Sequence, residues 1–362
     1  MSLNRGFWKD RRVFLTGHTG FKGSWLSLWL STLGAKVVGY ALEPPTSPSL
    51  YEQAGVDAFL HSIIADIRDF SCLRDAIAEF EPEVVLHLAA QSVVRTGYED
   101  PVGTYASNVM GTVHLLEAVR ALKRRCVIVN VTSDKCYDNR EWVWGYREID
   151  PMGGHDPYSN SKGCAELVTS AYRDSYFPPE SLHQHGVALA SARAGNAIGG
   201  GDWTAFQLIP DLMRAFIAGQ PCLIRNPLSY RPWQFVLEPL RAYLLLAERL
   251  ADRGAELASG WNFGPSEGDA KPVSWIADTL SAKWGRGASW TQDSAVSAKE
   301  ARALKLDTSK AAAALDWHPV LRIEKTLEWI AEWYQCFESG ADLRSVTLEQ
   351  IRRYERLLPG MD

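Results

Sequence analysis

The stretch Val13-Phe14-Leu15-Thr16-Gly17-His18-Thr19-Gly20-Phe21-Lys22-Gly23 is an apolar strand that breaks into a glycine turn and then opens a helix. Gly17 permits the tight turn, Gly20 lets backbone N–H groups approach a pyrophosphate, and Gly23 lets the helix pack close to the sheet. The positive end of that helix favours phosphate. A second apolar run, residues 36–41, completes a strand–helix–strand unit. The alternative is the same turn without a ligand.

Apolar runs alternate with helical patterns up to about residue 195, which predicts a parallel sheet covered by helices on both faces. The expected strands are residues 13–16, 36–41, 59–65, 83–90, 127–131 and 187–192, and the expected helices are residues 24–30, 71–80, 102–122 and a segment from Tyr158 onward. Beyond residue 195 the alternation weakens, and Gly, Pro and Trp become frequent.

We therefore expect the α/β class. A doubly wound parallel sheet of the Rossmann type should occupy residues 1–195, and a smaller, irregular C-terminal lobe should occupy residues 196–362. This lobe is expected to close over the carboxyl edge of the sheet, where such folds bind ligands. Residues of about 232–264 include a helical run and a short apolar run, and we expect them to return to the first domain.

The composition indicates a globular protein and argues against several partners. The chain has 362 residues, 46% hydrophobic and 22% charged, with a net charge of −5, which disfavours nucleic acid or an anionic membrane as partner. No apolar run reaches membrane-spanning length, and residues 1–10 lack the apolar centre of a signal peptide, so we expect a cytoplasmic protein. The six cysteines form no CxxC pair, and His155, His183 and His185 lack ligand spacing, so we expect reduced thiols and no metal.

A second motif, Tyr158-Ser159-Asn160-Ser161-Lys162, places a phenol and an ammonium one helical turn apart on the same face. A free tyrosine is a poor base at neutral pH, but an adjacent ammonium and a cationic nicotinamide ring both favour its phenolate. Tyr158 would then accept a proton from a sugar or alcohol hydroxyl while the cofactor takes the hydride. The alternative is a solvated helix face.

Polar side chains follow one another in Thr132-Ser133-Asp134-Lys135, directly after the apolar run 127–131. Catalytic groups collect at the carboxyl ends of strands in sheets of this kind. The alternative is a capped, solvated loop in which Asp134 and Lys135 are merely neighbouring charges.

These motifs resemble the extended short-chain dehydrogenase/reductase family. The shared positions span nearly the whole chain and comprise Thr16-Gly17-x-x-Gly20-x-x-Gly23, Leu88-Ala89-Ala90-Gln91, Asn108, Ser133, Tyr158-x-x-x-Lys162 and Arg193-Ala194-Gly195-Asn196. Within the family, residues 132–138, 231–234 and 260–265 most resemble the nucleotide-sugar 4,6-dehydratases that act on CDP-D-glucose. The resemblance implies NAD as cofactor, a nucleotide-sugar substrate, and a homodimer or homotetramer.

The resemblance also implies a set of cofactor contacts. They lie in the glycine turn, at the sheet edge and in the catalytic pair, and comprise Gly17, His18, Gly20, Phe21, Gly23, Asp66, Ile67, Leu88, Ala89, Ala90, Thr132, Tyr158 and Lys162. For His18 the alternative is a neutral histidine in packing. Where the family commonly offers Asp to the adenosine ribose, this chain has Glu43 at a shifted position, which either substitutes for it or is solvated.

The implied reaction starts with loss of hydride from C4 of the hexose to NAD⁺, while Tyr158 takes the O4 proton and Ser133 hydrogen-bonds that oxygen. The ketone acidifies the C5 hydrogen, a base removes it, Asp134 protonates the C6 hydroxyl, and water leaves. Hydride then returns to C6 and a proton to C5. Related dehydratases carry Glu after the Asp, whereas Lys135 follows here, so Lys135 is a candidate for the C5 base and its identity stays open.

A nucleoside diphosphate requires local positive charge, and arginine's planar fork suits phosphate oxygens. Arg231 and Arg193 are the candidates, with Asn196 as a neutral donor and Gln91 at the strand end. Arg193 has an alternative as a member of a structural ion pair. For the activity, the alternatives are an epimerase or another nucleotide-sugar dehydratase on the same fold, and a catalytically silent NAD-binding protein.

Overall fold

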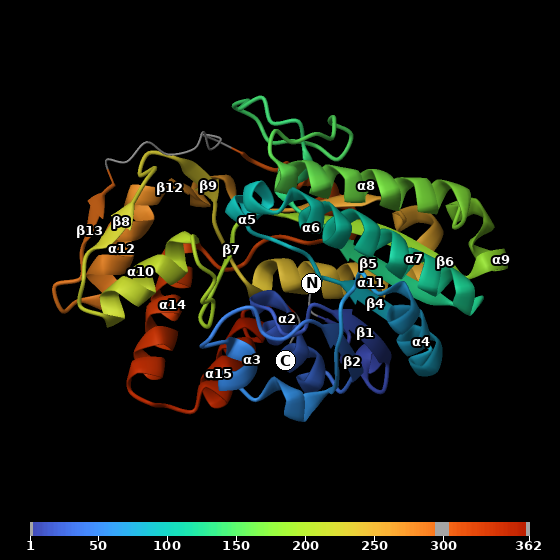
Figure 1. Cartoon of the computed structure of the whole chain (residues 1–362), viewed down its shortest axis with the longest axis horizontal. Helices are drawn as coiled ribbons and strands as arrows, with labels where there is room; N and C mark the ends of the chain where they lie inside the picture. The colour runs from blue at the N-terminus through green and yellow to red at the C-terminus, as the bar shows by residue number, and fades with distance from the viewer. Residues whose placement is uncertain (1–2, 294–303, 360–362) are drawn as a thin grey trace.

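One parallel sheet organises the computed structural model, which describes residues 3–293 and 304–359 (Figure 1). Its strand order is β11-β6-β5-β4-β1-β2-β3, and every neighbouring pair is parallel. The strands are β1 Arg12–Thr16, β2 Lys36–Ala41, β3 His61–Ile64, β4 Val84–His87, β5 Cys126–Val131, β6 Val187–Ala194 and β11 Gly260–Phe263. The doubly wound sheet predicted from the sequence is confirmed, and its strand order reverses between β1 and β4, where such folds bind ligands.

Side chains along β1 alternate between two hydrophobic cores. Val13 and Leu15 belong to the core that includes helices α2 and α11, whereas Phe14 belongs to the core that includes α4 and α7 and is contacted by α8. A strand buried on both faces requires this period of two. The covering helices are α2 Phe21–Thr32, α4 Phe70–Phe80, α7 Gly111–Leu122, α8 Pro157–Ser175 and α11 Leu237–Leu257.

The helix expected over residues 102–122 is divided. It consists of α6 (Pro101–Tyr105), a π-helical turn (Ala106–Met110) and α7. The side-chain amide of Asn108, in the π-helical turn, donates to Ser161 Oγ at 2.8 Å and to the Gln91 carbonyl at 2.9 Å. The prediction of one continuous α-helix is wrong at this point, because the wider turn directs Asn108 toward two neighbouring elements, as π-bulges at functional sites often do.

The C-terminal half forms the smaller lobe and also contributes to the sheet. Strand β11 pairs with β6, α11 packs against β5 and β6, and α15 packs against α2. In Figure 1, α10, α12, β8 and β13 gather at the left. The elements of this half other than α11 and β11 are β7 Ala197–Ile198, α10 Leu208–Ile217, β8 Cys222–Ile224, β9 Tyr230–Pro232, β10 Gln234–Phe235, β12 Ala270–Pro272, α12 Val273–Trp284, β13 Trp290–Gln292, α13 Ser309–Leu315, α14 Ile323–Glu338 and α15 Leu343–Glu355.

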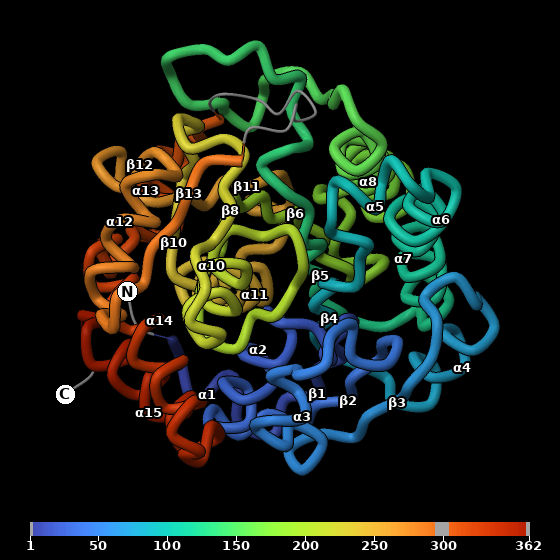
Figure 2. Tube along the Cα trace, turned by 60° about the vertical axis from the view of Figure 1, so that its left-hand side comes forward, coloured from blue at the N-terminus to red at the C-terminus, as the bar shows by residue number. Residues whose placement is uncertain are grey.

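Four helices lie together on one flank of the molecule. Figure 2 shows α5, α6, α7 and α8 side by side, and α8 contacts each of the other three. The remaining short helices are α1 Arg5–Trp8, α3 Leu50–Gln53, α5 Val94–Glu99 and α9 Leu182–His185. Over the part of the chain that the structure describes, no helix combines the length and apolarity needed to cross a membrane.

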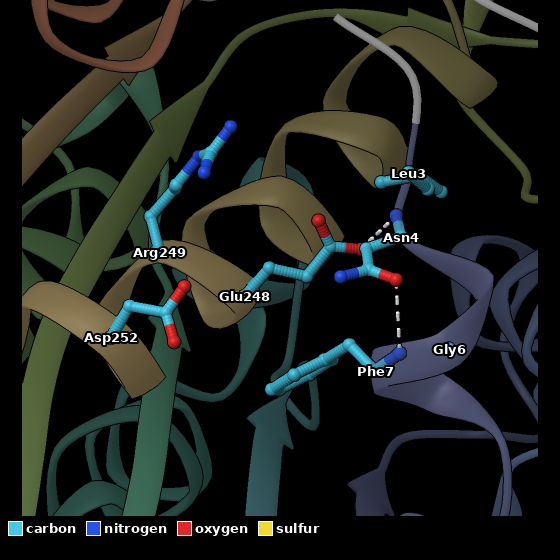
Figure 3. A pocket seen from close by; sticks show the side chains of 7 residues that line it. All are labelled: Leu3, Asn4, Gly6, Phe7, Glu248, Arg249 and Asp252. Atoms are coloured by element: carbon cyan, nitrogen blue, oxygen red, sulfur yellow. Dashed lines mark hydrogen bonds between the residues drawn. The ribbon is translucent and has the colours of Figure 1, made fainter.

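Figure 3 shows a surface pocket between the N-terminal segment and α11, with a volume of about 610 Å³. Glu248 of α11 accepts hydrogen bonds from the Asn4 backbone N–H at 2.9 Å and from the Trp8 indole N–H at 2.6 Å. Burial raises the pKa of Glu248 to about 7, although these two donors oppose the rise. None of the site residues expected from the sequence lines this pocket, and Glu248 serves to hold the N-terminal segment on α11.

Because the pKa of Glu248 is higher in the folded chain than its ordinary value of 4.5, its contribution to stability is full below that value and is lost as the pH rises through about 7. We expect Glu248→Gln, which keeps an acceptor oxygen, to remove this loss. Between about pH 5 and about pH 8, the free energy of unfolding should fall by about 1–3 kcal/mol more for the wild type than for the variant. Chemical denaturation at both pH values measures this, and equal falls would contradict it.

Candidate active site

The glycine turn after β1 is closely packed against its surroundings. Gly17 has φ +78°, and a Cβ there would lie 2.8 Å from the backbone nitrogen of Ala89. A Cβ on Gly23 would lie 2.0 Å from the Gly17 carbonyl oxygen. Both positions therefore require glycine, and the turn lies directly against the segment Leu88-Ala89-Ala90 that follows β4.

The cradle fits the pyrophosphate of a dinucleotide. Gly20 precedes α2 as its N-cap and offers no side chain to the first N–H groups of the helix, which are thus left for another acceptor. Thr16 Oγ1 accepts hydrogen bonds from the N–H groups of Leu88 and Ala89, at 3.1 and 3.0 Å, and fixes the strand end beside the turn. Phe21 occupies the first position of α2, and its ring approaches Gly199 of the other half of the chain.

Four of the five residues predicted to carry the chemistry, all except Lys135, are buried together at the end of β5 and the start of α8. Ser133 Oγ donates to Asp134 Oδ1 at 3.0 Å, and the interaction of Ser133 with Tyr158 lowers the pKa of that phenol. Lys162 Nζ lies 3.5 Å from the carbonyl oxygen of Val131, the last residue of β5. Ser133, Asp134, Tyr158 and Lys162 are at most 7% exposed, so their charges act in a poorly solvated environment.

Burial governs the ionisation of the Tyr–Lys pair. It raises the pKa of Tyr158 far above the ordinary value, and the hydrogen bond with Ser133 offsets only part of this rise. Burial, together with the nearby positive charge of Lys22, lowers the pKa of Lys162 to about 7, against the pull of Glu166. From the sequence we expected the Lys162 ammonium to favour the phenolate of Tyr158. In the folded chain without a ligand, desolvation of Tyr158 has the larger effect and favours the protonated phenol.

Lys22 is a site residue that the sequence argument missed. It stands at the second position of α2, inside the glycine stretch, and its charge acts on both Lys162 and Asp134. Burial lowers the pKa of Lys22 to about 8, while Asp134 raises it. The signal for Lys22 in the sequence was its position between Gly20 and Gly23 of the glycine turn. Lys135, which follows Asp134 in the chain, has a one-third exposed side chain, and its Nζ is 3.7 Å from Asp134 Oδ1.

Arg193 forms a buried ion pair with Glu166, as its structural alternative predicts. Its guanidinium donates to Glu166 Oε2 at 2.8 Å and to Tyr137 Oη at 2.7 Å, and its side chain is only 6% exposed. The sequence argument missed Glu166, which stands one helical turn after Lys162. Thr132, expected at the cofactor, instead donates its hydroxyl to Glu166 Oε1 at 2.5 Å.

The side chain of Gln91, in the loop after β4, forms its hydrogen bonds within the protein. Its amide donates to Thr104 Oγ1 at 2.9 Å, and its Oε1 accepts the backbone N–H of Val93. This geometry favours a positioning role for Gln91 over the substrate contact that we expected. Asn196 differs, because its Oδ1 is buried and has no hydrogen-bond partner among the described residues. Arg231 of β9 is partly exposed, and Pro232 beside it approaches Gly195.

Three residues expected to contact the cofactor, His18, Asp66 and Ile67, make other contacts within the protein. The His18 ring is buried and shares a hydrogen bond of 2.7 Å with Ser62 Oγ, and burial lowers its pKa to about 4, which favours the packing alternative. The Asp66 carboxylate is bound by Arg68, whose hydrogen bond lowers the pKa of Asp66. Ile67 is buried beneath Gly111. Any contact of Asp66 or Ile67 with adenine would be through the backbone or the exposed edge of Asp66.

Glu43 is exposed in the loop after β2. Among residues 3–293 and 304–359, no three His, Cys, Asp or Glu side chains gather so as to hold a metal ion. All six cysteines are free thiols.

The sheet, the glycine cradle and the buried Ser–Tyr–Lys set define the class of extended short-chain dehydrogenases/reductases. A family model described as GDP-mannose 4,6 dehydratase matches residues 14–330, and the chain belongs to this family of nucleotide-sugar-modifying enzymes. It is 56% identical over 352 residues to the CDP-glucose 4,6-dehydratase of Salmonella typhimurium, covering 97% of this chain and 98% of the relative.

Two solved structures show the same fold. A dTDP-glucose 4,6-dehydratase from Bacillus anthracis in complex with NAD matches with a TM-score of 0.73 and 20% identity, over 92% of this chain and 99% of that chain. A UDP-glucose 4-epimerase from Thermotoga maritima with UDP-glucose matches with a TM-score of 0.76 and 19% identity, over 90% and 99%. Because dehydratases and epimerases share this fold, the fold does not separate the two activities.

The two arginines predicted to bind substrate should behave differently. Arg193→Met leaves the Glu166 carboxylate buried without its cation, and should lower the free energy of unfolding by roughly 3–5 kcal/mol. Arg231→Ala, a partly exposed position in the smaller lobe, should change stability by less than about 0.5 kcal/mol and weaken nucleotide-sugar binding by about tenfold or more. Denaturation curves and titration calorimetry measure the two effects. Unchanged substrate affinity in Arg231→Ala would return Arg231 to a structural role.

Proposed function

We propose that the protein catalyses the NAD-dependent 4,6-dehydration of CDP-D-glucose to CDP-4-keto-6-deoxy-D-glucose. The observation that carries the proposal is the buried carboxyl of Asp134, whose Oδ1 lies 3.0 Å from the Ser133 hydroxyl at the same strand end. Oxidation at C4 needs the serine, the tyrosine and the lysine, whereas elimination of the C6 hydroxyl needs an additional acid beside them. The relative that is 56% identical carries this activity in its name and supports the choice of CDP-D-glucose.

The glycine cradle and the strand end after β4 would hold NAD, with the pyrophosphate on the N-terminus of α2. When bound, NAD supplies the acceptor for the hydride that leaves C4 and the donor for the hydride that enters at C6. Arg231, which is partly exposed, and the buried Oδ1 of Asn196 are the contacts proposed for the nucleotide sugar.

The chain's own residues then act on the hexose in sequence. Tyr158 removes the O4 proton while Ser133 hydrogen-bonds O4, and Asp134 protonates the leaving hydroxyl at C6. Two amines are candidates for the C5 base. Lys135 directly follows Asp134, and Lys22 has a pKa lowered by burial to about 8, which leaves part of its amine neutral near neutral pH.

Tyr158→Phe removes the base and keeps the shape of the ring. We expect turnover to fall by at least about a hundredfold while NAD affinity stays within about threefold of the wild type. The assay is incubation with CDP-, dTDP-, GDP- and UDP-hexoses, with spectroscopic detection of the 4-keto-6-deoxy product. A C4 epimer in place of that product would favour the epimerase alternative, and near-wild-type turnover of Tyr158→Phe would overturn the assignment of the base.

Self-association belongs to the same proposal. The flank formed by α5, α6 and α8 exposes apolar side chains, namely Tyr98, Val102, Tyr105 and Leu167, and a second copy of the chain would cover them. We expect a dimer or tetramer in solution, converted to a smaller species by Val102→Glu together with Leu167→Glu. Light scattering after size exclusion measures the mass, and a wild-type monomer would contradict the expectation. The cytoplasmic location expected from the sequence stays a prediction.

A further inference from the structure

The motif at residues 231–234 ends on a glutamine that the proposed reaction does not use. Gln234, in β10, is only 2% exposed. Its Nε2 donates to the carbonyl oxygen of Gly195 at 3.3 Å and to that of Phe263 at 3.4 Å. The opposite orientation of the amide would set its oxygen against two carbonyl oxygens, so these contacts fix which end is the nitrogen.

The other end of this amide is an acceptor without a donor. Gln234 Oε1 is buried and has no hydrogen-bond partner among the described residues. A buried acceptor that stays unpaired is unfavourable, and a bound ligand that brings a donor removes this penalty. Two more acceptors share this state, Asp134 Oδ2 and Asn196 Oδ1.

The three unpaired acceptors belong to side chains that meet around Gly195. A Cβ on this glycine would lie 2.6 Å from Asp134 Oδ2, and the glycine carbonyl binds Gln234 Nε2. Asn196 follows Gly195 in the chain, and the Asn196 carbonyl accepts the Gln234 backbone N–H at 3.1 Å. Several acceptors in one place fit a ligand that presents several hydroxyl groups, as a hexose does.

The two ends of the hexose set the direction of its ring. C1 carries the diphosphate, for which Arg231 is the proposed contact, and O6 is the proposed partner of Asp134. A Cβ on Gly195 would also lie 3.0 Å from Cγ of Pro232, the residue after Arg231. Residues 231–234 thus lead from the diphosphate contact to the surroundings of Asp134, along the length of the hexose.

We propose that Gln234 is a substrate-recognition residue whose Oε1 accepts a hydrogen bond from the 2- or 3-hydroxyl of the hexose. The inference rests on the proposed function, which assigns O4 to Tyr158 and O6 to Asp134 and so leaves these two hydroxyls. A hexose without the recognised hydroxyl leaves Oε1 unpaired and binds more weakly. Gln234 therefore selects against that deoxy sugar and takes no part in proton or hydride transfer.

Two other groups carry a donor and are alternatives to the hexose. The carboxamide of NAD presents an N–H. Tyr243 of α11 has a buried hydroxyl without a partner among the described residues, and its ring packs edge-to-face on Phe263, whose carbonyl binds Gln234. The position of Gln234 between the diphosphate contact and Asp134 favours the hexose, and the experiment separates the three donors.

The test measures, by titration calorimetry, the affinity of the NAD-loaded protein for CDP-D-glucose, CDP-2-deoxy-D-glucose and CDP-3-deoxy-D-glucose. Every variant also carries Tyr158→Phe, so that the bound sugar is not converted. With Gln234 intact, one of the two deoxy sugars should bind about tenfold or more weakly than CDP-D-glucose. Gln234→Met should weaken CDP-D-glucose by about tenfold and bring that deoxy sugar to within about threefold of it.

Trp233→Phe is the matched control. The Trp233 indole is buried and donates to the Lys271 carbonyl at 2.9 Å, a contact within the protein. Its loss should leave the ratio between the three sugars unchanged, and denaturation curves give the change in stability for both variants. If Gln234→Met does not fold, Gln234→Asn, which retracts the amide by one carbon, should show the same change in the ratio.

Three results would overturn the proposal. One is a ratio between the sugars that is near one in the wild type or unchanged in Gln234→Met. Another is a fall in NAD affinity with equal losses for every sugar, which would assign Oε1 to the carboxamide. The third is equal losses for every sugar in both Gln234→Met and Tyr243→Phe at unchanged NAD affinity, which would assign Oε1 to Tyr243.

The proposed function fails separately. A wild-type chain that releases no 4-keto-6-deoxy sugar from CDP-D-glucose would overturn the dehydration. The affinity ratios do not depend on turnover, so they would still decide whether Gln234 binds a hexose hydroxyl.

Discussion

The carboxylate of Glu166 joins the elements on which the site is built. It accepts hydrogen bonds from Thr132 after β5, from Ser191 of β6 at 2.7 Å and from Arg193 of β6 at 2.8 Å. Glu166 stands on α8, one turn after Lys162, so these bonds fix the catalytic helix against the strand end that carries Ser133. A buried carboxylate is tolerable only with such partners, which makes this junction a strict geometric constraint.

A second hydrogen bond of Arg193, to Tyr137, extends this constraint to the other half of the chain. Arg193 also donates to the Tyr137 hydroxyl, which in turn donates to Asn262 Oδ1 of β11 at 2.7 Å. Gly260–Phe263 forms the last strand of the sheet. In the sequence, this segment contributes to the resemblance to the dehydratases that act on CDP-D-glucose. The loop that follows Ser133 is thus held by Arg193 and Asn262, which stand 56 and 125 positions after Tyr137 in the sequence.

Desolvation decides the chemistry that these contacts allow. In water a phenol, two amines and a carboxylate would keep their ordinary ionisation, but at this sheet edge burial raises the pKa of Tyr158 and lowers those of Lys22 and Lys162. Charges that are screened at a protein surface act strongly on one another in such a site. The protonation state of each group in the site therefore depends on the protonation states of the others.

The local pattern of the sequence determined the sheet, the cradle and the candidates for the catalytic groups. Alternating apolar runs, glycine spacing and the four-residue interval from Tyr158 to Lys162 are short-range features, and the chain's own periodicity enforces them. Ser133 and Asp134 could be named because the carboxyl ends of parallel strands collect polar groups.

Only the tertiary structure decided which polar side chains are free for ligands. Arg193, Thr132, Gln91 and the His18 ring all looked available in the sequence, yet each has a partner, in most cases distant in the chain. Lys22 became part of the site through its placement near Asp134 and Lys162. Hydrogen bonding and desolvation depend on which groups fold next to each other, and that proximity is set by the packing of the whole chain.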